Sequence, residues 1–437
     1  MTLSGEIYSF EEAPLYQKSA QTYIETGIDI FDLKNKEAIP NVSTSSFPHA
    51  HSIVKLLKQI KTSKKKLRVL ECGAGNGIFA RHFLFACKKE GLLDKVEYLI
   101  SDFDFRIVKD LRSRSLYQEF KENVHFRYLK LDLMNLDECI DIKSKPFDLG
   151  EIDLVIMNYC LHALPCSIYK KDNELLEKLY IEFLEQDNHQ VQVLKEFWME
   201  EKKVRFEAKE KKYLDLLHNI AENYKQEQKI HFNFNALDAL EQLLNRLSPN
   251  GFIYIADIPT MDFDSRVSYR AFAGAIAYIL NSQLISNFVE TNKYWNYIHN
   301  DFILYKHIIS KSQPSFRFKQ TLKENFENNN PCVLFCEMIS AMKIFVSNQS
   351  YKAYKALLNE FLRIDDVSVY SKLYQAIYYM KIKKFKKSKK LFEEAEKVNF
   401  FTTCPVHQYQ KKLELLMERE SLLKSMKPKF FGLFEIN

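Results

Sequence analysis

A cluster of glycines near position 75 is the part of this sequence best suited to bind a ligand through its main chain. The chain has ten glycines, and three of them, Gly73, Gly75 and Gly77, fall within five positions. Glycine is required where the backbone adopts a positive φ or lets a ligand lie against it, and a following helix offers free N–H groups at its N-terminus. The apolar run before the glycines and the helical pattern at 78–89 predict a strand, a binding turn and a helix.

Two acidic residues stand where carboxylates can recognise both ends of a nucleoside that carries an amino acid. Glu71 lies two positions before the first glycine, where it can hold an ammonium group. Asp102 lies 25 residues after Gly77, at the end of the next apolar run. A carboxylate at that place accepts hydrogen bonds from both ribose hydroxyls. The GxGxG spacing also differs from the GxGxxG pattern of dinucleotide-binding turns.

The elements that must position these residues are short apolar runs separated by amphipathic helices. Strands that alternate with helices predict an α/β fold with a mostly parallel sheet covered on both faces. The predicted strands are 67–70, 96–100, 124–129, 152–157 and 252–256.

These motifs resemble the class I, Rossmann-like S-adenosylmethionine-dependent methyltransferases over about residues 67–260. The resemblance rests on the glycine turn, on Asp102, on Asp132 within 130–133, and on the run 152–162. It implies a seven-stranded sheet and S-adenosylmethionine as cofactor. By the same resemblance, Glu71 and the three glycines face the methionine part of the cofactor. Asp102 faces the ribose, Asp132 and Leu133 face the adenine, and Asn158 and Tyr159 line the methyl-transfer side.

Residues 158–165 also resemble the Asn-Glu-x-x-Asp-Ala-Leu-Pro stretch of the MidA family of protein arginine methyltransferases. Tyr159 and His162 stand where that family has acidic residues. His162 is a candidate general base, because an imidazole with an ordinary pKa near 6.5 can deprotonate an oxygen or nitrogen acceptor at neutral pH. The alternative is a structural histidine that is hydrogen-bonded beneath the pocket. We take Tyr159 and His162 as the candidate catalytic residues. Asp257 and Asp262, just after the last predicted strand, are weaker candidates for the acceptor side.

We expect four regions along the chain. A long segment free of glycine and proline, 170–245, predicts a helical lid or a homodimer element inserted in the cofactor-binding domain. In the last third, 351–364 aligns with 385–398 at an offset of 34 residues, which predicts tetratricopeptide-like hairpins; an ordinary helical bundle is the alternative. The predicted regions are an N-terminal helical cap at 1–60, the methyltransferase domain at 61–265, a helical connection at 266–330 and the all-helical repeat region at 331–437.

Composition narrows the remaining function classes. The net charge is +6 and no basic run is interleaved with aromatic residues, so a nucleic-acid partner is unsupported. No run of 18 apolar residues and no secretory signal appears, which predicts a cytoplasmic protein without a membrane span. The eight cysteines form no CxxC pair, so we expect no metal site.

The methyl acceptor stays open between a protein, a peptide and a small molecule. The helical repeat favours a protein partner, because such repeats usually bind proteins. Two further readings of the glycine turn are a nicotinamide or flavin dehydrogenase and a non-catalytic binding scaffold.

Overall fold

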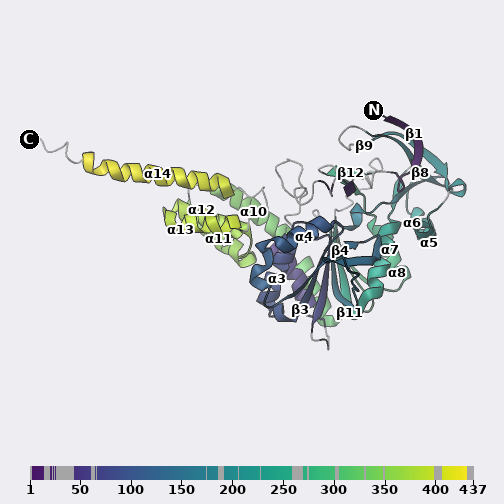
Figure 1. The fold of residues 1–437 in the computed structure, drawn as a ribbon, viewed down its shortest axis with the longest axis horizontal. Helices are drawn as coiled ribbons and strands as arrows, with labels where there is room; N and C mark the ends of the chain where they lie inside the picture. The colour runs from purple at the N-terminus through teal and green to yellow at the C-terminus, as the bar shows by residue number, and fades with distance from the viewer. Residues whose placement is uncertain are drawn as a thin grey trace, which may run out of the picture.

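The chain forms a sheet domain, an attached second sheet and a C-terminal helical region, as Figure 1 shows. The computed structural model describes residues 2–13, 20, 21, 23, 25, 44–60, 64, 66–173, 175–185, 191–204, 206–226, 228–257, 269–272, 275–300, 305–328, 331–347, 350–397 and 406–430. No helix within these ranges is long and apolar enough to cross a membrane.

The main sheet has eight strands, and its five central ones are parallel. In spatial order the strands are β14 (Trp295–Asn300), β15 (Tyr305–Ser310), β11 (Leu247–Asp257), β6 (Ile152–Asn158), β2 (Leu67–Cys72), β3 (Val96–Asp102), β4 (His125–Asp132) and β5 (Asn135–Asp141). The strands β5, β15 and β14 join antiparallel. All five predicted strands are confirmed, and the resemblance's seven-stranded sheet gains one strand.

The order of the strands reverses between β2 and β6. From β2 the chain moves outward through β3 and β4, and it then returns to β6 and β11 on the other side. In open α/β sheets the crevice outside the carboxyl ends of the strands at such a reversal is the usual ligand site.

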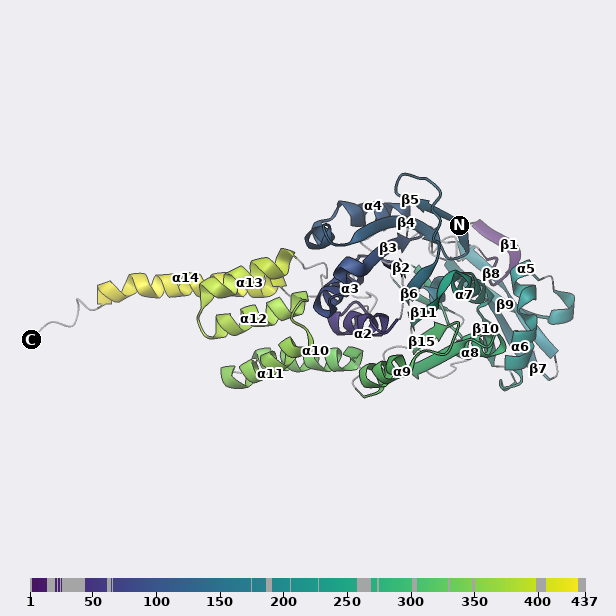
Figure 2. The same cartoon turned by 90° about the horizontal axis from the view of Figure 1, so that it is seen from below.

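Helices cover both faces of this sheet, as Figure 2 shows. The helices α2 (Phe47–Leu57), α3 (Ile78–Glu90) and α4 (Phe105–Ser113) pack on one face, and α6 (Leu214–Ala221), α7 (Phe234–Arg246) and α8 (Ser282–Thr291) pack on the other. Side chains alternate between the faces along a strand. On β2, Val69 accordingly contributes to the first core and Leu70 to the second, and both are fully buried.

The predicted helical insertion at 170–245 is wrong for most of its length. In its described residues the segment contributes strands to a five-stranded antiparallel sheet, and its α-helices are the short α5 (Ala208–Lys212), α6 and α7. The strands of this second sheet are β1 (Thr2–Ser9), β7 (Ser167–Asp172), β8 (Leu175–Glu185), β9 (Val191–Glu200) and β10 (Lys229–Phe232). The β8 sequence has apolar residues that fit either period, and its pairing with β1, β7 and β9 decides for a strand.

Two further predicted boundaries are corrected. The N-terminal cap at 1–60 includes a strand, because β1 pairs with β8, and it also includes the helix α2. The helical connection at 266–330 includes β14 and β15, which complete the main sheet, so the sheet domain extends to Ser310. Before them in the sequence lies the hairpin of β12 (Tyr269–Phe272) and β13 (Ala275–Tyr278). After them come α9 (Phe316–Leu322) and a short π-helix at Lys323–Glu327.

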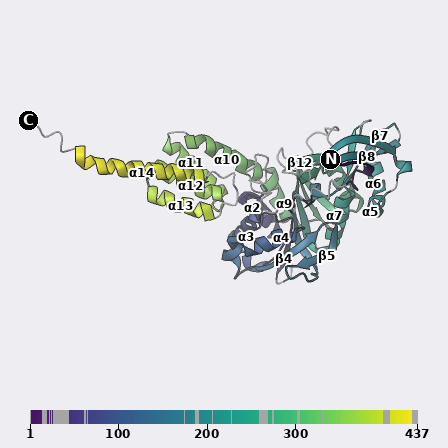
Figure 3. The same ribbon diagram turned by 45° about the horizontal axis from the view of Figure 1, so that its top comes forward.

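The region after residue 330 is built from helices in the part that the structure describes, as predicted. Its helices are α10 (Pro331–Ser347), α11 (Tyr351–Ile364), α12 (Val369–Lys381), α13 (Phe385–Lys397) and α14 (Val406–Phe430), and Figure 3 shows them extending away from the sheet domain. The starts of α11 and α13 are offset by the 34 residues of the sequence repeat, while Val398 lies outside the described residues. The tetratricopeptide-like pairing itself stays a prediction.

The helical region packs against the sheet domain at α2 and α3. The buried core of the helical region includes Phe335, Tyr354 and Leu373, and it also includes Ile78, the first residue of α3. Ile78 is 3% exposed. The first turn of the helix after the glycines is therefore shared between the two regions.

A buried lysine ties the N-terminal segment to the second sheet. Lys178 Nζ on β8 lies 2.5 Å from Glu11 Oε1 and 2.8 Å from Glu210 Oε2, and its side chain has no exposure to solvent. Burial raises the pKa of Glu11, although the charge of Lys178 opposes this rise. Two buried carboxylates thus depend on one cation.

We predict that Lys178→Met lowers the free energy of unfolding by about 3 to 5 kcal/mol, because it leaves buried carboxylates without a cation. Urea unfolding followed by circular dichroism measures this change. The control is Lys203→Met, which removes an exposed lysine paired with Glu200 and is expected to cost well under about 1 kcal/mol. Equal losses of stability in the two variants would contradict the role of Lys178 as the cation that balances Glu11 and Glu210.

Candidate active site

The turn after β2 has the backbone that its glycines predict. Gly73, Gly75 and Gly77 have φ values of +64°, +51° and +76°, in the left-handed region. An added Cβ on Gly73 would lie 2.8 Å from Cys160 Sγ, and one on Gly77 would meet Leu111 at 2.6 Å. Both the conformation and the close approach of neighbours therefore require glycine at these positions.

The carboxyl end of β3 holds this turn in place. Ala74 N donates to Ser101 O at 2.8 Å, and Gly75 N donates to Asp102 Oδ2 at 3.1 Å. The Ser101 hydroxyl donates to Glu71 O at 2.7 Å. Two adjacent parallel strands thus form one rigid edge.

Glu71 is a buried carboxyl group without a cationic partner among the described side chains. It is 3% exposed, and Tyr98 OH donates to its Oε2 at 3.0 Å. Burial raises the pKa of Glu71 to about 8, with a further contribution from Asp102, whereas the Tyr98 hydrogen bond lowers it. Among the residues that the structure describes, no lysine or arginine forms an ion pair with it. A cationic ligand group would restore the ionised carboxylate.

Asp102 lies next to the same turn and accepts hydrogen bonds from several donors. Besides Gly75 N, it accepts from Asp104 N at 3.1 Å and from Tyr23 OH at 3.3 Å. It is 1% exposed, and burial raises its pKa to about 6 although these hydrogen bonds lower it. The acceptance of the Tyr23 hydroxyl shows that this carboxylate can receive an O–H group.

Two buried amide atoms, one on the turn and one across from it, lack a hydrogen-bond partner among the described residues. Asn158 Oδ1, at the end of β6, and Asn76 Nδ2, within the glycine turn, have no hydrogen-bond partner among the described residues. Cys160 Sγ donates to Cys72 O at 3.0 Å, which brings the segment after β6 against the end of β2. Buried polar atoms are normally paired, so these two amides point to a polar ligand.

A histidine–aspartate pair lies at the ends of β6 and β11. His162 Nδ1 is 2.5 Å from Asp257 Oδ1, and His162 N donates to Asp257 Oδ2 at 3.3 Å. The His162 side chain is 11% exposed. When the Nδ1–H group of neutral His162 donates a hydrogen bond to Asp257, Nε2 carries the lone pair that a general base needs.

Tyr159 connects this pair to the end of β6 through a strained turn. Its φ is +56°, which is uncommon for a residue other than glycine, and its N–H donates to Ala256 O at 2.9 Å. The rings of Tyr159 and His162 meet edge to face with centroids 6.0 Å apart. The two candidate catalytic residues are therefore in contact.

Asp132 and Leu133 lie at the carboxyl end of β4, farther along the same edge. Asp132 Oδ1 accepts from Met134 N at 2.8 Å, and Leu133 is 9% exposed within the hydrophobic core. No hydrogen bond found among the described residues joins either of them to the glycine turn. The structure thus groups the other predicted site residues around β2 and β6 and leaves these two on β4.

Sequence reasoning undervalued the residues that support the site. The sequence indicates Asp257 only as a weaker candidate for the acceptor side, although its position directly at the end of a predicted strand favours a place in the site. Asp262, considered with it, lies outside the described residues. The roles of Tyr98 and Cys160 depend on contacts across strands and have no local sequence signal.

We predict that Gly73→Ala lowers the free energy of unfolding by about 1 to 3 kcal/mol more than Gly91→Ala does. Both positions have a positive φ, but an added Cβ on Gly91 meets nothing within 4 Å, so only Gly73→Ala adds overpacking to the conformational cost. Thermal unfolding of the two variants measures the difference. Similar losses in both would mean that Cys160 does not crowd the turn.

Comparison with known proteins identifies the family. Residues 50–270 match the model of a family described as "Putative S-adenosyl-L-methionine-dependent methyltransferase". None of the curated proteins matches the chain in sequence.

Several solved structures resemble the chain at low identity. A COG1565 superfamily member from Burkholderia thailandensis bound to S-adenosyl-homocysteine is 15% identical, with a TM-score of 0.41, over 58% of this chain and 63% of that one. A native structure of a COG1565 superfamily protein from the same organism is 14% identical, with a TM-score of 0.40, over 65% and 77% of the two chains. The plantazolicin methyltransferase BpumL in complex with SAH is 13% identical, with a TM-score of 0.35, over 73% and 90%.

The family match spans half of the chain and includes the glycine turn, both flanking carboxylates and the histidine–aspartate pair. The protein therefore belongs to this family of S-adenosyl-L-methionine-dependent methyltransferases, whose cofactor is S-adenosyl-L-methionine.

Proposed function

We propose that the protein transfers a methyl group to an O–H or N–H group of a protein or peptide acceptor, with His162 as the general base. The observation that carries this proposal is the buried pair of His162 and Asp257, with Nδ1 and Oδ1 2.5 Å apart. A carboxylate in this position fixes the tautomer and the orientation of the imidazole ring. Asp257 acts through His162 and is a positioning residue.

The residues around β2 fit the cofactor's chemical groups. In this proposal Glu71 balances the ammonium of the methionine part, while Gly73, Gly75 and Gly77 let the main chain approach it. Asp102 accepts the ribose hydroxyls, in the way that it accepts the Tyr23 hydroxyl in the structure. The unpaired Asn158 Oδ1 supplies a further acceptor on the methyl-transfer side. Asp132 and Leu133, at the end of β4, take the adenine.

The acid–base chemistry follows from this arrangement. When bound, S-adenosylmethionine supplies an electrophilic methyl carbon, which an acceptor lone pair takes as the carbon–sulfur bond breaks. His162 Nε2 takes the acceptor proton, and Asp257 stabilises the imidazolium that forms. General base catalysis of this kind typically contributes about 10²- to 10⁴-fold to a rate. Tyr159, in contact with His162, lines the acceptor side.

The proposed setting is the cytoplasm. Five cysteines in the described part of the chain are free and buried, at positions 72, 87, 139, 160 and 166. Reduced thiols are the normal state in a reducing compartment. The acceptor is proposed to be a protein or peptide because the C-terminal helices, of a kind that often binds proteins, pack against α3, the helix that follows the glycine turn.

We predict that the affinity for S-adenosylhomocysteine rises with pH up to about pH 8. Below that value the buried Glu71 carboxyl is mostly protonated, and the ligand ammonium requires its charged form. Affinity is expected to rise by up to about tenfold per pH unit between pH 6 and 7.5. Isothermal titration at several pH values measures the slope. Glu71→Gln should flatten it, whereas Glu138→Gln, an exposed change on β5, should not.

The same raised pKa has a consequence for the free protein. Between pH 4.5 and about 8 the folded state holds a proton on Glu71 that the unfolded state has lost. By linkage, this residue's contribution to stability falls as pH rises through that window.

The binding experiment can contradict the proposed role of Glu71. If the affinity of Glu71→Gln for S-adenosylhomocysteine rises with pH as steeply as that of the unaltered protein, Glu71 does not bind the ligand ammonium.

We predict that His162→Gln lowers methyl transfer by about 10²-fold or more while cofactor binding stays within about threefold. The assay is transfer of tritiated methyl from S-adenosylmethionine to whole-cell protein and, separately, to the small-molecule fraction. Asp257→Asn should lower the rate and change its pH profile, because the amide can hold the wrong tautomer. The control is His125→Gln, since the His125 side chain is 53% exposed on β4.

The outcomes separate the alternatives. Label only in the small-molecule fraction would replace the protein acceptor with a metabolite. Cofactor binding without transfer to either fraction would favour a non-catalytic scaffold. Full activity in His162→Gln would leave this histidine with a structural role.

A further inference from the structure

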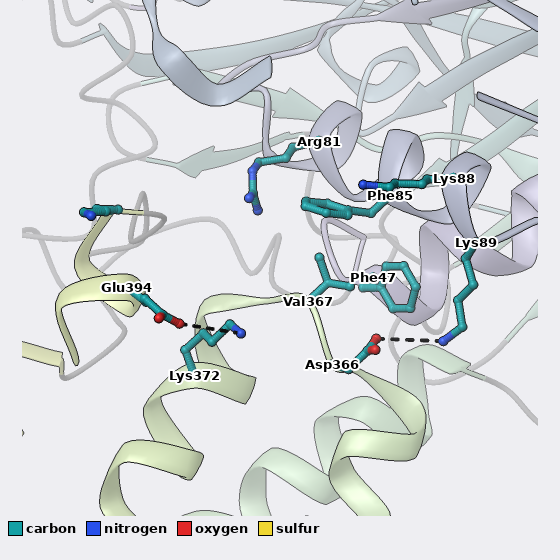
Figure 4. Close-up of a pocket in the computed structure, with 10 residues that line it drawn as sticks. Phe47, Arg81, Phe85, Lys88, Lys89, Asp366, Val367, Lys372 and Glu394 are labelled. Atoms are coloured by element: carbon teal, nitrogen blue, oxygen red, sulfur yellow. Dashed lines mark ion pairs between the residues drawn. The ribbon is translucent and has the colours of Figure 1, made fainter. Parts of the chain in front are cut away.

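An open cavity of about 600 Å³ lies between the sheet domain and the helical region, and its lining includes none of the predicted cofactor-binding residues. Figure 4 shows side chains from both regions meeting there. Arg81, Phe85, Lys88 and Lys89 come from α3, and Lys372 and Glu394 come from α12 and α13. A volume of this size lies within the usual range for ligand pockets.

The lining carries an excess of positive charge. Of its ten residues, five are basic and two are acidic, which gives a formal charge of +3. Lys88 and Lys397 form no ion pair with any residue that the structure describes. Lys89 pairs with Asp366 across the cavity, and Lys372 pairs with Glu394 within the helical region. Both pairs have N···O distances of 3.8 Å, which is longer than a hydrogen bond.

The cavity also has apolar surface between its charges. Phe47, Phe85 and Val367 line it. The Arg81 guanidinium lies 4.6 Å from the centre of the Phe85 ring and pairs with Glu119 at 3.0 Å, so this cation is held in place by the protein itself. The ligand must therefore offer separated anionic groups together with an apolar one.

We propose that this cavity binds an acidic polypeptide segment of a partner protein. Its lysine residues come from α3 and from α12 and α13, and a lysine ammonium is a point charge without the bidentate geometry with which arginine recognises a phosphate. An extended peptide can present carboxylates to Lys88, Lys372 and Lys397 while an apolar side chain lies on Phe85 and Val367. Binding of the peptide in this cavity is separate from binding of the cofactor at the glycine turn and does not require methyl transfer.

The test uses the full-length protein and a fluorescein-labelled peptide of eight glutamates with one central phenylalanine. Fluorescence anisotropy should show binding that weakens as salt is raised from 0.05 to 0.5 M, as charge pairing requires. The double substitution Lys88→Glu with Lys397→Glu should weaken binding at least about tenfold. The matched control, Lys143→Glu with Lys145→Glu near β5, changes the net charge equally and should alter affinity less than about twofold.

Further measurements decide the proposal. The same peptide with glutamine in place of glutamate should not bind, and thermal unfolding should show that both double variants are folded. Equal losses in the two double variants, or no binding by the unaltered protein at low salt, would overturn the proposal. Displacement of the peptide by equimolar pyrophosphate would assign the cavity to small phosphate ligands instead.

Discussion

The parallel pairing of β2 with β3 on one side and β6 on the other is the constraint on which the site depends. Because β2 lies at the reversal of strand order, the chain that leaves it must turn sharply in the crevice between its neighbours. Three left-handed glycines permit that turn. The end of β3 then holds it from one side through Ser101 and Asp102, and Cys160 closes on it from the other.

The electrostatics of the site follow from the same geometry. A turn buried at the centre of a sheet removes Glu71 and Asp102 from water, so both pKa values rise above their ordinary range. The protein stabilises these carboxyls with hydrogen bonds but supplies no described cation to Glu71. A site that is electrostatically incomplete by itself favours a ligand with a positive charge, and this family's cofactor carries an ammonium and a sulfonium group.

Local signals in the sequence were enough for one half of the site and insufficient for the other. Glu71, the glycines and Asp102 lie within a strand–turn–helix and the strand that follows, where residue type and spacing report directly on structure. The contact of His162 with Asp257 joins residues 95 positions apart, and only the pairing of β6 with β11 creates it. The second sheet failed to be predicted for a similar reason, because β8 takes partners from the first ten residues and from 191–200.

Through Ile78 the C-terminal helices help to hold the helix that follows the glycine turn. This side chain starts the helix that follows the last glycine, yet its neighbours belong to the far region of the chain. A protein truncated before α10 would expose this apolar residue to water one position after Gly77. Such a fragment would be expected to lose affinity for its methyl donor even if the helices never touch that molecule. The helices from α10 onward thus support the glycine turn, which lies about 250 residues earlier in the sequence.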